Sequence, residues 1–205
     1  MSGRIELERR ADGVAVLWID NPAHRNALNN ALIDALTGHC RALAADASCR
    51  VIVMRGRGGI FCAGRELRDL RALQDASNDT IVATYEKLKA LNEAVWFCPK
   101  PTVALIEKYA FGAGATLSSW CDIALSEETA LFAYPEVHHG FPPSPALMAL
   151  FLAVGRKKAM ELVLTGRRID ALEADRIGLI TRAVPAAALE AELDKLLAGL
   201  LRSGP

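Results

Sequence analysis

The sequence has no excess of charge of either sign. Lysine and arginine together number 24, and aspartate and glutamate also number 24. A neutral chain has no global field that draws it to nucleic acid or to an anionic membrane surface, although a local basic rim for an anionic ligand is compatible with it. We therefore expect neither nucleic acid nor a membrane as a partner.

Long apolar runs are also missing. No window reaches the roughly 18 apolar residues that a membrane-spanning helix needs, and the first residues lack the apolar run of a secretory signal. A cytoplasmic location is therefore the default expectation. The 205 residues, 52% of them hydrophobic, are enough to bury a sizeable core.

The cysteines lack any pairing signal. Five are scattered along the chain, without a CxxC motif or a paired Cys/His spacing, which argues against a zinc site or a disulfide framework. We expect no metal, and reduced thiols that pack as small hydrophobes. Cys62, beside Ala63 and Gly64, could be considered as a nucleophile, but packing is the better interpretation.

What the sequence does contain is an alternation of strands and helices. Strands are predicted at 5–9 and 14–19, joined by a turn at Asp12 and Gly13, and then a helix at 27–45 and a strand at 49–54. Further on we predict a helix at 79–97, a strand at 102–106, a short helix opened by residues 112–114, and a strand at 122–125. Everything beyond Pro145 is predicted to be helical, at 146–154, 157–164, 171–177 and 189–201. The alternation is typical of an α/β fold, with a core of residues 1–143 and a helical C-terminal segment of residues 144–205.

Two glycine-containing loops follow apolar strands, at residues 55–67 and 109–115. Ligands bind at the carboxyl ends of strands in open α/β sheets. Small residues let a backbone approach a ligand closely, and a following helix start leaves N–H groups free to donate. Two such loops that face one point form an oxyanion hole; the alternative is that both are turns. Neither matches a phosphate or dinucleotide motif, and the RGRGG run at 55–59 is a weak match to an RNA-binding segment.

A carboxylate stands in an unusual apolar stretch, since residues 132–143 read FAYPEVHHGFPP. Burial of Glu136 would raise its pKa, as a general acid or base needs; the alternative is an ordinary surface glutamate. The adjacent His138 and His139 cannot share one helical face, and the HExxH metal motif is missing. We predict that both histidines lie in a loop or an interface.

The order and spacing of these segments resemble the crotonase superfamily, the enoyl-CoA hydratase/isomerase family, nearly from end to end. Residues 21–28 read NPAHRNAL, similar to the family's N-P-x-x-x-N-A-L element. Residues 61–67 read FCAGREL, similar to its F-C-A-G-x-D-L signature, with Glu66 in place of the usual aspartate. Residues 100–114, 121–124 and 135–136 resemble its second signature and the continuation of that signature.

The resemblance implies a spiral of strand–strand–helix (ββα) units with a helical C-terminal part that is shortened relative to the family. It also implies trimers or pairs of trimers, an acyl-CoA thioester substrate from fatty-acid or related metabolism, and no cofactor beyond the coenzyme A of that substrate. The two oxyanion donors carry over to the N–H groups of Arg65 and Ala113. Residues carried over for coenzyme A and acyl-group binding are Arg25, Ala27, Ala63, Gly64, Leu67, Phe111, Gly112, Pro135 and Phe141. We expect residues 68–80 and 141–150 to line the acyl pocket.

One departure from the family bears on the reaction. Hydratases of this family commonly use two glutamates, and here the first position is Thr116 while the second is Glu136. Two carboxylates can share the work of adding water, whereas one group can remove a proton at one carbon and return it at another. A lone Glu136 therefore fits an enoyl-CoA isomerase slightly better than a hydratase. The alternatives are decarboxylation or thioester hydrolysis through the same enolate, and a catalytically weak acyl-CoA-binding or assembly subunit.

Overall fold

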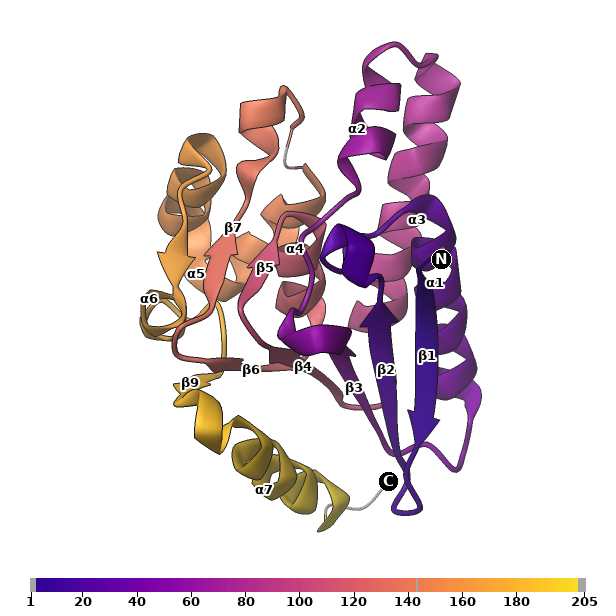
Figure 1. Cartoon of the computed structure of the whole chain (residues 1–205), viewed down its shortest axis with the longest axis vertical. Coiled ribbons are helices and arrows are strands. Elements are labelled where there is room, and N and C mark those ends of the chain that lie inside the picture. The colour runs from indigo at the N-terminus through magenta and orange to yellow at the C-terminus, as the bar shows by residue number, and fades with distance from the viewer. Residues whose placement is uncertain (1–2, 143, 203–205) are drawn as a thin grey trace.

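The centre of the molecule is a six-stranded sheet in the order β1-β2-β3-β4-β6-β9 (Figure 1). The computed structural model describes residues 3–142 and 144–202, so the predicted boundary at residue 143 and residues 203–205 lie outside the described part. The strands β1 and β2 form an antiparallel hairpin, and every other neighbouring pair in this sheet is parallel. Their bounds are β1 (Arg4–Arg9), β2 (Val14–Asp20), β3 (Val51–Gly56), β4 (Thr102–Ile106), β6 (Ile123–Glu127) and β9 (Arg182–Val184).

A second sheet of three short strands, in the order β5-β7-β8, stands beside the first. The strands β5 and β7 pair in parallel, and β7 and β8 pair antiparallel. Their bounds are β5 (Tyr109–Phe111), β7 (Leu131–Ala133) and β8 (Ile169–Asp170). Because β5 follows β4 after two residues and leads directly into the next helix, this small sheet fixes where that helix starts.

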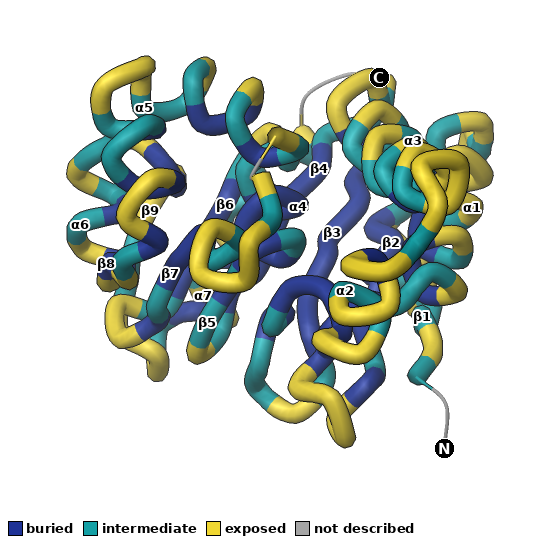
Figure 2. The backbone as a smooth tube through the Cα atoms, turned by 90° about the horizontal axis from the view of Figure 1, so that it is seen from above, coloured by how far each residue is buried: buried dark blue, intermediate teal, exposed yellow. Residues whose placement is uncertain are grey.

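Helices cover both faces of the large sheet. One face, with Val14, Val16 and Val53, packs on α7, while the alternate residues such as Ala15 and Leu17 face the main core. Strands buried on both faces read as continuous apolar runs. Figure 1 shows α7 below the sheet, apart from the other helices, and Figure 2 shows the buried strands enclosed by exposed helical surfaces. The helices are α1 (Asn30–Ala45), α2 (Leu67–Gln74), α3 (Asn78–Trp96), α4 (Ala113–Trp120), α5 (Ser144–Thr165), α6 (Ala171–Arg176) and α7 (Leu189–Arg202).

The predicted α/β fold is confirmed, but the C-terminal part is not wholly helical as predicted. The strands β8 and β9 interrupt it, and each is too short to show a period-two pattern. The two helices predicted at 146–154 and 157–164 form one element, α5, with a break at Gly155, whose φ is 73°. The first predicted helix begins at Asn30 rather than at residue 27, because the Asn29 side chain caps it by accepting from the Leu32 N–H. Within the described residues, no helix combines the length and apolarity needed to cross a bilayer.

Candidate active site

The loop between β3 and α2 is held by backbone hydrogen bonds on both sides. On one side the Phe111 N–H donates to the Cys62 carbonyl at 3.0 Å. On the other side the Leu28 N–H donates to the Gly64 carbonyl at 2.7 Å, and the Glu66 N–H donates to the Leu28 carbonyl at 3.0 Å. The loop therefore runs as an extended segment between β5 and residue 28. This pairing brings the two predicted glycine loops side by side.

Glycine lets the two loops approach closely. Gly64 has a φ of +98°, and a Cβ there would lie 2.8 Å from the Phe111 carbonyl oxygen. A Cβ at Gly114 would lie 2.6 Å from the Cys62 carbonyl oxygen, which is closer than real Cβ contacts allow. Any larger residue at these positions would separate the first loop from the start of α4.

Two backbone N–H groups lie free where the loops meet. In the β-bridge between Leu28 and Arg65, the hydrogen bonds to Leu28 are made by the Gly64 carbonyl and the Glu66 N–H. The Arg65 N–H therefore has no acceptor in the described chain. Ala113 is the first residue of α4, where an N–H has no acceptor within its helix. A Cβ on Gly64 would be only 3.5 Å from the Ala113 nitrogen, so the two donors lie close together. The Arg65 side chain does not fill the space between them, since its Nη2 donates to Asn30 Oδ1 at 2.9 Å.

The N-P-x-x-x-N-A-L segment, residues 21–28, is hydrogen-bonded to this loop. The Asn26 side chain is fully buried and donates through Nδ2 to the carbonyls of Arg57, at 2.9 Å, and Ile60, at 2.6 Å. The Arg25 carbonyl accepts from the Ala63 N–H at 3.2 Å. This segment therefore positions the loop by hydrogen bonds.

Glu66, the departure from the usual aspartate, has a structural role. Its buried carboxylate accepts from Asn21 Nδ2 and from Asn29 Nδ2, each at 3.0 Å. These two hydrogen bonds tie the start of α2 to residues 21–29.

We expect Glu66→Ala to lower the free energy of unfolding by about 2–3 kcal/mol, because hydrogen bonds to a buried charge are lost and two amide donors are left without this acceptor. Urea denaturation measures the effect. Glu128→Ala, at an exposed position, is the control and should change stability by less than about 0.5 kcal/mol. Equal effects of the two variants would contradict this role.

A cavity of about 110 Å³ opens next to the two N–H groups. Most of the predicted site residues line it, and these are Ala63, Gly64, Arg65, Leu67, Gly112, Ala113, Thr116, Pro135, Glu136 and Phe141. Arg25, Ala27 and Phe111 do not line this cavity. The Phe111 ring instead stacks on the Tyr109 ring, with centroids 4.8 Å apart.

Glu136 brings a carboxylate to the same point. It lies in the 3₁₀ helix Pro135–His139, and its Oε1 would be 3.1 Å from a Cβ built on Gly112. Its Oε2 is buried and has no hydrogen-bond partner in the described residues. Burial raises the pKa of Glu136, only partly offset by a hydrogen bond from its own backbone. Glu136 therefore differs from an ordinary surface glutamate, and its carboxylate shares the cavity with the two backbone donors.

Comparison with known proteins identifies the family. The chain matches the model of the enoyl-CoA hydratase/isomerase family over residues 9–205. The chain belongs to this family. A probable enoyl-CoA hydratase of Mycobacterium tuberculosis is 34% identical over 183 residues, which cover 88% of this chain and 68% of that protein. The 2,3-dehydroadipyl-CoA hydratase of Escherichia coli is 35% identical over 179 residues, which cover 86% of this chain and 68% of that protein.

Solved structures of enoyl-CoA hydratase/isomerase proteins share the crotonase-like fold of this chain. The crystal structure of an enoyl-CoA hydratase of Mycobacterium smegmatis has a TM-score of 0.92 and 31% sequence identity, covering 96% of this chain and 76% of that chain. Human enoyl-CoA hydratase domain-containing protein 3 has a TM-score of 0.89 and 29% identity, covering 97% of this chain and 77% of that chain.

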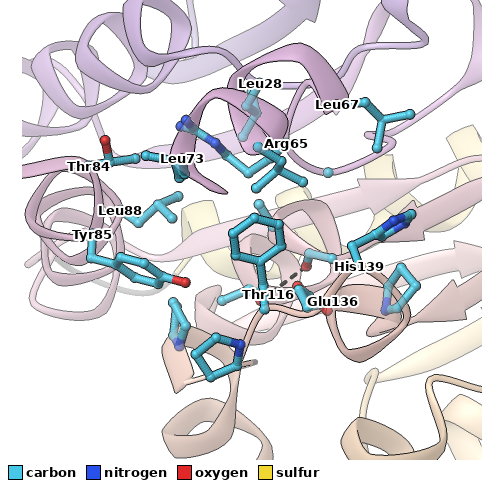
Figure 3. Close-up of a pocket in the computed structure, with 18 of the residues that line it drawn as sticks. Leu28, Arg65, Leu67, Leu73, Thr84, Tyr85, Leu88, Thr116, Glu136 and His139 are labelled. Atoms are coloured by element: carbon cyan, nitrogen blue, oxygen red, sulfur yellow. Dashed lines mark hydrogen bonds between the residues drawn. The ribbon is translucent and has the colours of Figure 1, made fainter. Parts of the chain in front are cut away.

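Thr116, which the sequence resemblance assigns to the position of a glutamate, lies beside Glu136 in the cavity (Figure 3). Its side chain is buried, and its Oγ1 donates to the Gly112 carbonyl at 3.0 Å. The single proton of the hydroxyl is therefore used within α4. Thr116 can accept a hydrogen bond from a ligand but has no proton left to donate.

Besides the two loops and the 3₁₀ helix, α2 and α3 also line the cavity. The sequence motifs did not predict the contribution of α3. Leu70 and Leu73 fall within the predicted 68–80 segment, but the α3 residues were not among the predicted site residues. Their spacing of three or four along a helix is a sequence signal that marks one face. The cavity residues on α3 are Thr84, Tyr85, Leu88, Leu91 and Asn92.

The cysteines and histidines were the other candidate groups. All five cysteines are free thiols, and burial raises the pKa of Cys62 to about 12, so its thiol stays protonated. His139 lines the cavity, whereas His138 packs against Gly166. Within the described ranges, no three His, Cys, Asp or Glu side chains are grouped to hold a metal ion.

Proposed function

We propose that this protein is an acyl-CoA enzyme that holds a thioester oxygen between the N–H groups of Arg65 and Ala113 and moves a proton with Glu136. The observation that carries the proposal is the meeting of two unpaired backbone donors and one desolvated carboxylate at one cavity. Fixed donors aimed at a developing negative charge stabilise an enolate without reorganising. No metal and no redox group is needed for this chemistry.

The reaction that fits one carboxylate best is a shift of a double bond. Glu136 takes a proton from the α-carbon of a 3-enoyl-CoA, and the electron pair moves onto the thioester oxygen between the two N–H groups. The same carboxyl group then returns the proton to the γ-carbon, which leaves a 2-enoyl-CoA and a regenerated carboxylate. One group performs both transfers. We therefore propose enoyl-CoA isomerisation as the main reaction.

Hydration is the second candidate, because relatives of this chain are named enoyl-CoA hydratases. It passes through the same enolate but also requires a water molecule held beside Glu136. Incubation with 2-enoyl-CoA and 3-enoyl-CoA in heavy water separates the two reactions by mass spectrometry. Isomerisation adds no water, and deuterium reaches the γ-carbon only from Glu136 that has exchanged its proton with the solvent, whereas hydration adds the mass of heavy water and places deuterium at the α-carbon. Calorimetric binding of acyl-CoA without turnover would contradict both reactions and favour a binding subunit.

The pH profile should show the titration of Glu136. The group acts first as a base, so only its carboxylate form starts the reaction. Since burial raises its pKa above 4.5, we expect kcat/KM to be constant at neutral pH and to fall as the pH falls through this raised pKa. The measurement is kcat/KM for a 3-enoyl-CoA between mildly acidic and neutral pH. A profile with its acid limb at or below the ordinary carboxyl range would contradict this role of Glu136.

A further inference from the structure

In hydration, Glu136 and Thr116 can each accept a hydrogen bond from the reacting water molecule, but neither can donate one to it. A donor to the water oxygen would fix which of its lone pairs points at the β-carbon. Thr116 donates its only hydroxyl proton to the Gly112 carbonyl. A second hydroxyl group facing the same space would complete the arrangement.

Tyr85 supplies such a hydroxyl. It lies on α3 and lines the same cavity as Thr116 and Glu136, and Figure 3 shows its ring entering the cavity with the hydroxyl directed toward these two residues. In residues 3–142 and 144–202, no side chain or backbone group is hydrogen-bonded to this hydroxyl. The hydroxyl therefore has both its proton and its lone pairs available for a ligand.

The charges around Tyr85 keep it a neutral donor. Burial and then the charge of Glu136 raise the pKa of its phenol, while Arg65 acts in the opposite direction. The phenol therefore stays protonated at neutral pH in the cavity that it shares with Glu136. A neutral phenol beside a carboxylate is suited to orient a water molecule between them rather than to act as a base.

Tyr85 is not needed to hold its helix in place. The Ser77 side chain caps α3 at its N-terminus, and Leu91 and Val95 anchor its buried face. Tyr85 itself is only partly buried. Removal of its hydroxyl alone should therefore leave the position of α3 unchanged.

We propose that the Tyr85 hydroxyl holds the water molecule that Glu136 deprotonates, which makes Tyr85 a positioning residue for hydration. The inference rests on the proposed function. Glu136 takes one proton from the water, the water oxygen bonds to the β-carbon, and the electron pair of the double bond moves toward the thioester oxygen. Glu136 then gives its proton to the α-carbon, so the elements of one water are added and the carboxylate is regenerated.

Tyr85→Phe tests this role, because it removes the hydroxyl and keeps the ring. The variant and the wild type are compared on a 2-enoyl-CoA, for hydration, and on a 3-enoyl-CoA, for isomerisation. We expect the ratio of the two kcat values to move up to about tenfold against hydration, as the loss of one hydrogen bond to the reacting water allows. The KM for the 2-enoyl-CoA should stay within about twofold, because the thioester contacts remain.

The control is Tyr109→Phe, at a tyrosine that stacks on Phe111 outside the cavity; it should leave the ratio unchanged. An unchanged ratio in Tyr85→Phe, or a parallel loss of both reactions with a lowered melting temperature, would overturn the role of Tyr85. Wild-type protein that isomerises but does not hydrate would overturn it too, and would leave the proposed function intact. Wild-type protein that binds acyl-CoA and performs neither reaction would overturn both.

Discussion

Replacement of Glu136 by glutamine is expected to lower kcat for enoyl-CoA turnover by about 10²–10⁴-fold, because the amide can neither accept nor return a proton. The shape of the cavity should be kept, since glutamine has the size of glutamate and Oε2 has no partner in the described residues to lose. The measurement is kcat in an enoyl-CoA panel, together with calorimetric binding of a saturated acyl-CoA. Unchanged kcat would contradict the role of Glu136.

A stability measurement accompanies this variant as its control. The folded state binds the proton of Glu136 more tightly than the unfolded state, because burial raises the pKa of this group. A raised carboxyl pKa gives stability that is present at low pH and lost as the pH rises through the folded-state pKa. Glu136→Gln removes that loss, so the variant should be at least as stable as the wild type at neutral pH. A variant that loses both stability and acyl-CoA binding would show a folding defect instead.

Replacement of Gly114 by alanine is expected to lower kcat by about 10²–10³-fold, which is the typical effect of losing one oxyanion donor. The new Cβ would lie 2.6 Å from the Cys62 carbonyl oxygen and 2.7 Å from the Cys62 Cβ. The loop must then move away from α4, and the Arg65 N–H moves with it relative to the Ala113 N–H. The measurement is kcat for a 3-enoyl-CoA, with the melting temperature as a check on folding.

The matched control is Gly38→Ala on α1, where nothing lies within 4 Å of the added Cβ. This change should leave kcat unchanged and raise stability by up to about 1 kcal/mol, because alanine is a better helix former. If Gly114→Ala kept the kcat of the wild type, the close approach of the two loops would not be needed for turnover.

The large sheet could be predicted from the sequence because its strands are buried on both faces. Val51–Gly56 and Thr102–Ile106 are apolar enough to be recognised, and Asp12 with Gly13 marks the hairpin turn between β1 and β2. The strands of the small sheet could not be predicted in this way. They are two or three residues long, and their pairing partners come from distant parts of the chain.

The candidate site also contains residues that could be predicted from the sequence and residues that could not. Residues of the two loops could be predicted because glycine and a following helix start leave a mark in the sequence. Tyr85 could not, because a helix predicted at 79–97 does not reveal which of its faces meets a cavity built by other segments. Contacts such as that between Glu66 and Asn21 depend on residues 45 positions apart. The division at residue 143 and the trimeric assembly stay predictions.

The two donors are main-chain groups, and this decides where the sequence is free to vary. Any residue other than proline carries an N–H at position 65 or 113, so the donor itself does not depend on which side chain stands there. The choice of residue is restricted at the neighbouring positions, Gly64 and Gly114. These glycines carry no reacting atom, but a side chain there would keep the two backbones apart. For the proposed oxyanion hole, the residues with the least freedom are therefore those whose contribution is the absence of a side chain.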